Sequence, residues 1–191
     1  MSARKHFLFI VFSDPVVVGA LQFLASVLDP KRVLEKPHLT IQGPFEEKVD
    51  LERIESVRKY LRNDVFFIGN PGIFDTPGGV ALYLSVYSEN LRRVWNKPDY
   101  PIDKFGFNPH ITIYEGNDIN RAKAALGFLG KNRLELLCHD FEVAQYVQKQ
   151  IDMFPVDGVD GDVDAIGKLM TRGNLGPSFR ARFMAAVNSS L

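Results

Sequence analysis

Two short segments of the chain carry the same pair of potentially catalytic side chains. The pentapeptide Pro-His-Leu-Thr-Ile at 37–41 recurs as Pro-His-Ile-Thr-Ile at 109–113. Because successive side chains of a strand point to opposite faces, we expect His38 and Thr40 to share one face, and His110 and Thr112 to share another. Each strand then offers one imidazole and one hydroxyl on its polar side. An approximate two-fold relation would bring the two pairs face to face across a cleft.

Two opposed imidazoles suit in-line displacement at phosphorus, where the attacking and leaving oxygens lie on opposite sides of the phosphorus atom. A neutral histidine accepts the proton of the nucleophile, and a protonated histidine donates a proton to the leaving oxygen. Both forms are accessible near neutral pH because the ordinary pKa of histidine is about 6.5. The threonine hydroxyls can donate hydrogen bonds to the non-bridging phosphate oxygens. This chemistry requires neither a metal ion nor another cofactor.

The motifs also have two other interpretations. A single His-X-Thr is most often an ordinary strand sequence, but two copies in the same context favour a functional site. Two histidines without a carboxylate on the same strands are a poor ligand set for zinc. Glu115 is the exception, although strand alternation predicts that it points away from His110 and Thr112.

The same alternation extends the candidate site by one residue on each strand. Gln42 follows Thr40 on its face and is expected to hydrogen-bond a base or a ribose. Tyr114 follows Thr112 and is expected to stack on a base. Both also fit solvated positions at a strand end. The basic candidates near the cleft mouth, which are equally typical of a solvated surface, are Lys36, Arg92, Arg93, Lys97 and Lys104.

The elements predicted around the two pentapeptides repeat in the same order. A strand at 7–12 followed by Ser13 corresponds to a strand at 81–87 followed by Ser88, 75 positions later. The two histidines lie 72 positions apart, and the expected helix caps Asp50 and Asp118 lie 68 apart. A preserved order with slowly drifting offsets indicates an internal duplication. It predicts an α+β fold, a duplicated bilobed domain whose antiparallel sheets line a central cleft, with helices outside.

The chain divides by composition into three parts. Residues 1–150 are predicted to form the bilobed domain, with repeats at about 5–75 and 79–150. Residues 151–164 are rich in aspartate and glycine and are predicted to be a linker. Residues 165–191 form a C-terminal extension whose apolar patch at 179–187 predicts a helix, packed on the domain or on a partner.

Composition excludes several classes of protein. The 191 residues include 23 basic and 23 acidic side chains, so nucleic acid is not held by bulk charge. The single cysteine, Cys138, excludes an internal disulfide and is expected to be a small core residue. The apolar runs at 7–12 and 16–28 are shorter than the roughly 20 residues of a membrane span. We therefore expect a soluble, cytoplasmic, monomeric protein without membrane contact.

The paired His-X-Thr motifs in a duplicated α+β chain resemble the two-histidine (2H) phosphoesterase superfamily, which includes 2′-5′ RNA ligase-like proteins and cyclic nucleotide phosphodiesterases. The resemblance covers about residues 5–150. It implies metal-independent action on 2′,3′-cyclic phosphates or 2′-5′ linkages, without cofactors, and catalytic roles for the four histidine and threonine residues. The chain departs from the bacterial ligase-like branch after the second motif, where Tyr114, Glu115 and Gly116 replace an often basic segment.

The resulting hypothesis is a phosphoric diester hydrolase that opens 2′,3′-cyclic phosphates on RNA 3′ ends or small nucleotides. One alternative is cleavage or joining of 2′-5′ phosphodiester bonds in RNA or oligonucleotides. Another is a non-catalytic RNA- or nucleotide-binding module on the same fold. The sequence does not choose between hydrolysis and ligation, and it does not assign the general base to either histidine.

Overall fold

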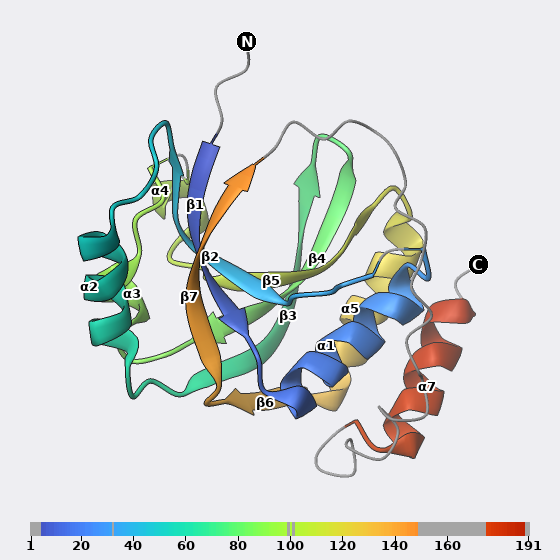
Figure 1. The fold of residues 1–191 in the computed structure, drawn as a ribbon. Coiled ribbons are helices and arrows are strands. Elements are labelled where there is room, and N and C mark those ends of the chain that lie inside the picture. Colours follow the sequence, from blue (N-terminus) through green and yellow to red (C-terminus); the bar gives the residue numbers. More distant parts are fainter. Residues whose placement is uncertain (1–4, 32, 99, 101, 149–174, 190–191) are drawn as a thin grey trace.

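A computed structural model describes residues 5–31, 33–98, 100, 102–148 and 175–189. The predicted linker at 151–164 lies outside these residues. Within them the protein is an α+β structure built on two antiparallel sheets (Figure 1). A single hydrophobic core runs through both sheets and the helices that cover them.

The first sheet has the strand order β2-β1-β7 and the second has the order β5-β4-β3-β6. The first consists of β1 (Lys5–Phe12), β2 (His38–Phe45) and β7 (Phe141–Gln148). The second consists of β3 (Phe66–Thr76), β4 (Gly79–Tyr87), β5 (His110–Gly116) and β6 (Glu135–Cys138). The motifs predicted to lie on strands therefore begin β2 and β5, one in each sheet.

Helices cover the sheets on two sides. They are α1 (Pro15–Leu28), α2 (Leu51–Leu61), α3 (Leu91–Val94), α4 (Ile102–Phe105), α5 (Ile119–Asn132) and α7 (Pro177–Asn188). Helices α1, α5 and α7 pack together, while α2 lies against β7 and α3 on the opposite side (Figure 1). The described helices include no span whose length and hydrophobicity would carry the chain through a bilayer.

Aspartate side chains fix the beginning of the three long helices near the motifs. Asp14 accepts hydrogen bonds from the backbone N–H groups of Val16 and Val17 at the start of α1. Asp50 and Asp118 each accept one from the third residue after them, at the starts of α2 and α5. These bonds satisfy donors that a helix leaves unpaired. The caps predicted from the sequence are present.

Helix α7 lies within the predicted C-terminal extension and packs on the domain itself. Its buried residues Phe179, Phe183 and Val187 recur every four positions and form one stripe. The rings of Phe179 and Phe183 lie 5.2 and 5.5 Å from that of Phe128 on α5. Phe183 also lies 6.1 Å from Phe23 on α1. The extension therefore belongs to the main core.

The strand pairs β1–β2 and β4–β5 have the same register. Phe9 pairs with Thr40 as Tyr83 pairs with Thr112, and Leu8 pairs with Gln42 as Leu82 pairs with Tyr114. In each pair one isoleucine, at 41 or at 113, is an extra residue without a partner. Such an extra residue is a β-bulge, and it reverses the alternation of the side chains that follow it.

The sheets do not follow the predicted repeat limits of 5–75 and 79–150. Strand β3 lies before the limit but pairs with β4, and β7 lies at the chain's far end but pairs with β1. Strand β3 must pair with β4 because only two residues connect them, which produces an antiparallel hairpin. Each sheet therefore contains one strand from the other predicted repeat.

Cys138 is completely buried at the end of β6, as the sequence predicted. Its thiol donates to the backbone carbonyl of Asp140 over 3.2 Å. Burial raises the pKa of the Cys138 thiol to about 11, although the neighbouring backbone bonds oppose the effect. A thiol that stays protonated at neutral pH is a poor nucleophile.

Candidate active site

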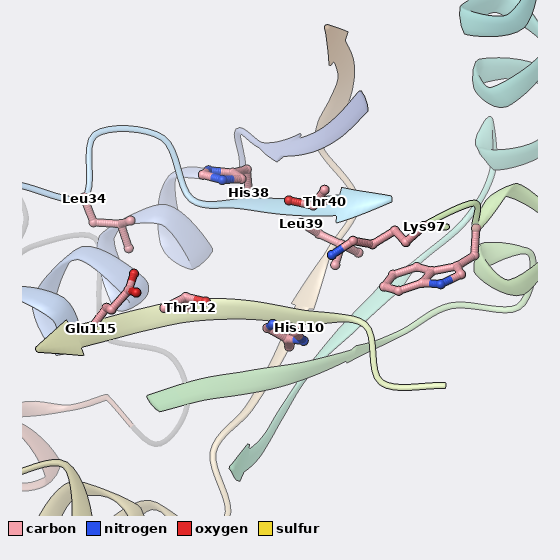
Figure 2. A pocket seen from close by; sticks show the side chains of 9 residues that line it. Leu34, His38, Leu39, Thr40, Lys97, His110, Thr112 and Glu115 are labelled. Carbon is pink, nitrogen blue, oxygen red and sulfur yellow. The ribbon is translucent and has the colours of Figure 1, made fainter. Parts of the chain in front are cut away.

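The four histidine and threonine residues of the motifs line one pocket of about 220 Å³ between β2 and β5 (Figure 2). The lining residues are Leu34, His38, Leu39, Thr40, Trp95, Lys97, His110, Thr112 and Glu115. The two strands cross the pocket in opposite directions, so each histidine lies near the threonine of the other strand (Figure 2). Two sequence segments 72 positions apart thus contribute equivalent groups to one small space.

Both imidazoles are held in the same way by the backbone. The Nδ1 atom of His38 lies 3.0 Å from the carbonyl oxygen of Lys36, and that of His110 lies 2.8 Å from the carbonyl oxygen of Asn108. A carbonyl oxygen only accepts, so Nδ1 carries the hydrogen in both rings. This bond fixes the tautomer and leaves Nε2 to accept or donate a proton at a substrate.

An aromatic ring supports each imidazole from the neighbouring strand. Phe9 on β1 stacks on His38 with ring centroids 4.2 Å apart. Tyr83 on β4 occupies the same register position and lies 4.8 Å from His110, at a tilt of 46°. These contacts restrict ring rotation, which keeps the Nδ1 bonds in place.

Burial lowers the pKa of His110 below its usual value of 6.5, and the positive charge of Lys97 lowers it further. The bond from the ring to the Asn108 carbonyl opposes the shift without cancelling it. His110 is therefore neutral at neutral pH. A neutral imidazole whose Nε2 faces a substrate can accept a proton.

Lys97 is the basic candidate that lies in the pocket. Its Nζ atom lies 5.7 Å from the ring centre of Trp95 and 5.5 Å from that of Tyr100, within cation–π range. Arg92 instead lies over Phe107, 5.4 Å from its ring centre, and does not line the pocket. The side chain of Lys104 lies outside the described part of the structure. The Lys97 ammonium places a positive charge at the pocket.

Glu115 also lines the pocket, so the prediction that it points away was wrong. The bulge at Ile113 adds a residue to β5, and Ile113 and Tyr114 are consequently both buried. The next side chain, Glu115, then returns to the face of Thr112. In Figure 2 Glu115 lies beside Thr112, at the end of the pocket away from Lys97.

The same bulges remove Gln42 and Tyr114 from the pocket. Both side chains are only 5% exposed. The amide of Gln42 donates to the Val94 carbonyl over 2.8 Å and accepts from Arg53 Nε over 2.7 Å. The Tyr114 hydroxyl accepts from the backbone N–H of Asp118 over 3.1 Å. The predicted roles in base binding are corrected to internal hydrogen bonds that fix the ends of β2 and β5.

Trp95 reaches the pocket through a contact that sequence reasoning missed. Asn96 pairs with β2, donating to the Ile41 carbonyl over 2.9 Å and accepting from the Gly43 N–H over 3.0 Å. These bonds place Trp95 and Lys97, on either side of Asn96, at the pocket edge (Figure 2). The sequence around Asn96 contains no pattern that would predict its pairing with β2.

The pocket combines two proton-transfer groups, two hydroxyl donors, one cation and one carboxylate. Within the described residues no three or more His, Cys, Asp or Glu side chains gather closely enough to hold a metal ion. Comparison of the chain with models of known families, with curated proteins and with solved structures gives no match.

Proposed function

We propose that this protein is a metal-independent phosphodiesterase that hydrolyses 2′,3′-cyclic phosphates of RNA ends or nucleotides. The observation that carries the proposal is the pair of imidazoles in one pocket, each fixed through Nδ1 to a backbone carbonyl and each adjoined by a threonine. A phosphate bound in the pocket would meet an imidazole from each sheet. This is the arrangement that general acid–base catalysis at phosphorus requires.

His110 is proposed as the general base and His38 as the general acid. The lowered pKa of His110 keeps its Nε2 unprotonated, so that it can take a proton from the attacking water. The water oxygen forms a bond to phosphorus, the bond to one ribose oxygen breaks, and His38 gives that oxygen a proton. The product is a phosphate monoester beside a free hydroxyl. Proton exchange with solvent then restores both histidines.

The remaining pocket groups act on the charge of the phosphate. Thr40 and Thr112 donate hydrogen bonds to the non-bridging oxygens, where negative charge increases in the transition state. Lys97 adds a positive charge at one end of the pocket. Donors and charges that are already in position need not reorganise during the reaction.

The proposal includes a duplicated, bilobed fold of the two-histidine type. Its support is the equivalence of β1–β2 and β4–β5 in register, bulge position and histidine contacts. The exchanged strands occupy corresponding places too, since β7 pairs antiparallel with β1 as β3 pairs antiparallel with β4. Independent origins would not be expected to repeat all four features.

The test is product analysis with purified protein, excess chelator and three substrates. These are nucleoside 2′,3′-cyclic phosphates, a short RNA ending in a cyclic phosphate, and a 2′-5′-linked dinucleotide. The proposal expects ring opening to a monophosphate, abolished in His110→Ala. Cleavage of the dinucleotide alone would assign the protein to 2′-5′ linkages. Binding without turnover of any substrate would contradict enzymatic function.

A further inference from the structure

Two further hollows adjoin the central pocket, one on each side of the histidine pair. The hollow beside His38 has a volume of about 500 Å³ and shares His38 and Leu34 with the pocket. The hollow beside His110 has a volume of about 640 Å³ and shares His110 and Lys97 with it. A phosphate in the pocket would therefore have room for a substituent on either side.

The hollow beside His110 is aromatic. It is lined by Phe74 of β3, Tyr83 of β4 and Tyr100, all of which are half-buried. Phe74 lies 5.5 Å from Tyr83 and 5.4 Å from His110, at tilts of 37° and 68°. A tilted neighbour covers less of a ring face than a stacked one, so these rings retain surface on which a flat group can stack.

The position of Tyr83 is fixed by its neighbours. A Cβ atom at Gly72 would lie 2.3 Å from the Tyr83 hydroxyl, so the ring packs directly on the glycine backbone. The hydroxyl also accepts a hydrogen bond from the Asn108 amide over 3.0 Å. Contacts within the protein thus hold the Tyr83 ring in position without a ligand.

The polar lining of this hollow favours a base over a second phosphate. Asp75 is exposed and contributes a carboxylate, which repels phosphate but accepts hydrogen bonds from amino and imino groups of bases. Asn108 adds an amide. Aromatic walls with a few polar groups are typical of sites for flat heterocycles.

The hollow beside His38 has a different lining, in which the ring next to the histidine is already stacked. The ring of Phe9 lies between its neighbours on β2 and β7, nearly parallel to His38 at 4.2 Å and to Tyr146 at 5.0 Å. Both faces of Phe9 are therefore occupied. The rest of this lining consists of Tyr146, which is 48% exposed, aliphatic side chains, Gln145 and three charged residues, Lys36, Glu35 and Glu142. Two carboxylates and a lysine make this side more highly charged than the hollow beside His110.

We infer that the hollow lined by Phe74, Tyr83 and Tyr100 is a nucleobase subsite, which makes the substrate a nucleotide or oligonucleotide with a base on the His110 side of the phosphate. This inference rests on the proposed function, since it assumes that a phosphodiester occupies the central pocket. Phe74 is its specificity-determining residue, because it can stack on the base.

The test compares a nucleoside 2′,3′-cyclic phosphate with methyl riboside 2′,3′-cyclic phosphate, which has no base. Phe74→Leu is expected to reduce kcat/KM for the nucleotide by about 5- to 100-fold, the usual range for loss of base stacking, mainly through KM. Activity on the base-free substrate should change little. Phe74→Tyr should restore nucleotide activity because it keeps the ring. Phe67→Leu is the matched control, since Phe67 lies on the same strand, 53% exposed and outside the hollow.

Two results would overturn the inference. An equal loss on both substrates would mean that Phe74 acts only through its contact with His110. No loss on either would mean that no base lies against Phe74.

Binding separates this inference from the proposed function. Calorimetry with nucleoside 2′-monophosphates and with ribose 2-phosphate measures base-dependent affinity without turnover. If the protein hydrolyses nothing but binds the nucleotides more tightly in a Phe74-dependent manner, hydrolysis is wrong and the subsite stands. Equal affinity for nucleotide and ribose phosphate would reject the subsite whatever the activity.

Discussion

The two histidine strands share a backbone design but differ in what surrounds them. In both, the imidazole bonds through Nδ1 to the carbonyl two residues earlier, and a bulge follows the threonine. His38 stacks on Phe9, whereas His110 is tilted against Tyr83 and has a pKa lowered by burial and by Lys97. The shared design gives two equivalently held imidazoles, and their surroundings are unequal; in the proposed mechanism this inequality assigns them different roles.

Strands β2 and β5 also differ at the second residue after the bulge. On β5 this residue is Glu115, a carboxylate in the pocket. The corresponding residue of β2 is Gly43, which does not line the pocket. Its φ is +102°, and it has no space for a side chain, because a Cβ would lie 2.6 Å from the His6 carbonyl oxygen. At this position β5 therefore adds a charged side chain to the pocket, and β2 adds none. In the proposed mechanism the features common to both strands carry the reaction, and this difference changes the charge around the substrate.

The largest expected effect tests whether the two histidines form one unit. His38→Ala and His110→Ala should each reduce kcat by about 10²- to 10⁴-fold, as expected for loss of a general acid or base. The double variant should lose far less than the product of the two losses, since paired catalytic groups act together. His139→Ala, at an exposed position outside the pocket, is the control. Multiplicative losses would contradict the paired mechanism.

The threonines provide a milder test of the same symmetry. Thr40→Val and Thr112→Val each remove one donor to a charged phosphate oxygen, which predicts a loss in kcat/KM of about 10- to 100-fold. Steady-state kinetics on one cyclic nucleotide would measure both variants. A loss confined to one threonine would show that only one strand holds the phosphate.

Glu115→Gln removes the charge that distinguishes the two strands. A carboxylate near an anionic substrate opposes binding, so the variant should reduce KM by roughly 2- to 10-fold with kcat nearly unchanged. Glu135→Gln changes the net charge equally at an exposed position outside the pocket. A large fall in kcat would instead assign Glu115 a direct role with the substrate.

The smallest expected effect concerns pH. The acid limb of kcat/KM should lie below pH 6.5, because burial first and Lys97 second lower the pKa of His110. Lys97→Met should move that limb to higher pH, since removal of a positive charge favours the imidazolium. Lys123→Met, on the exposed face of α5, should not move it. A limb that stays in place in Lys97→Met would assign the titration to another group.

The sequence predicted those features that depend on short segments. These are the strands that begin at His38 and His110, the caps at Asp50 and Asp118, and the apolar stripe of α7, all of which have local signals. The histidines and threonines were also assigned correctly to shared faces, because they precede the bulges.

The errors arose where strand geometry departs from regular alternation. The prediction assigned three side chains to the wrong face, namely those of Gln42, Tyr114 and Glu115. The extra residue in each strand is an isoleucine, which is common in regular strands, so the sequence gives no sign of the bulge. The bridge that brings Lys97 to the pocket joins residues more than fifty positions apart. The pairing of β3 with β4 and of β7 with β1 was also missed. The hydrophobic pattern of a segment can indicate a strand, but it does not indicate which strand it pairs with.

The exchange of β3 and β7 bears on how a chain of this kind can originate. Strand β3 joins the sheet that contains β4 and β5, and β7 joins the sheet that contains β1 and β2. Under the proposed duplication, a half-length ancestor would have had an incomplete sheet, and it would have completed that sheet by accepting a strand from a second identical molecule. Domain-swapped homodimers of this type are readily formed. In such a dimer one histidine per subunit would have sufficed, and gene fusion would then have freed the two copies to diverge.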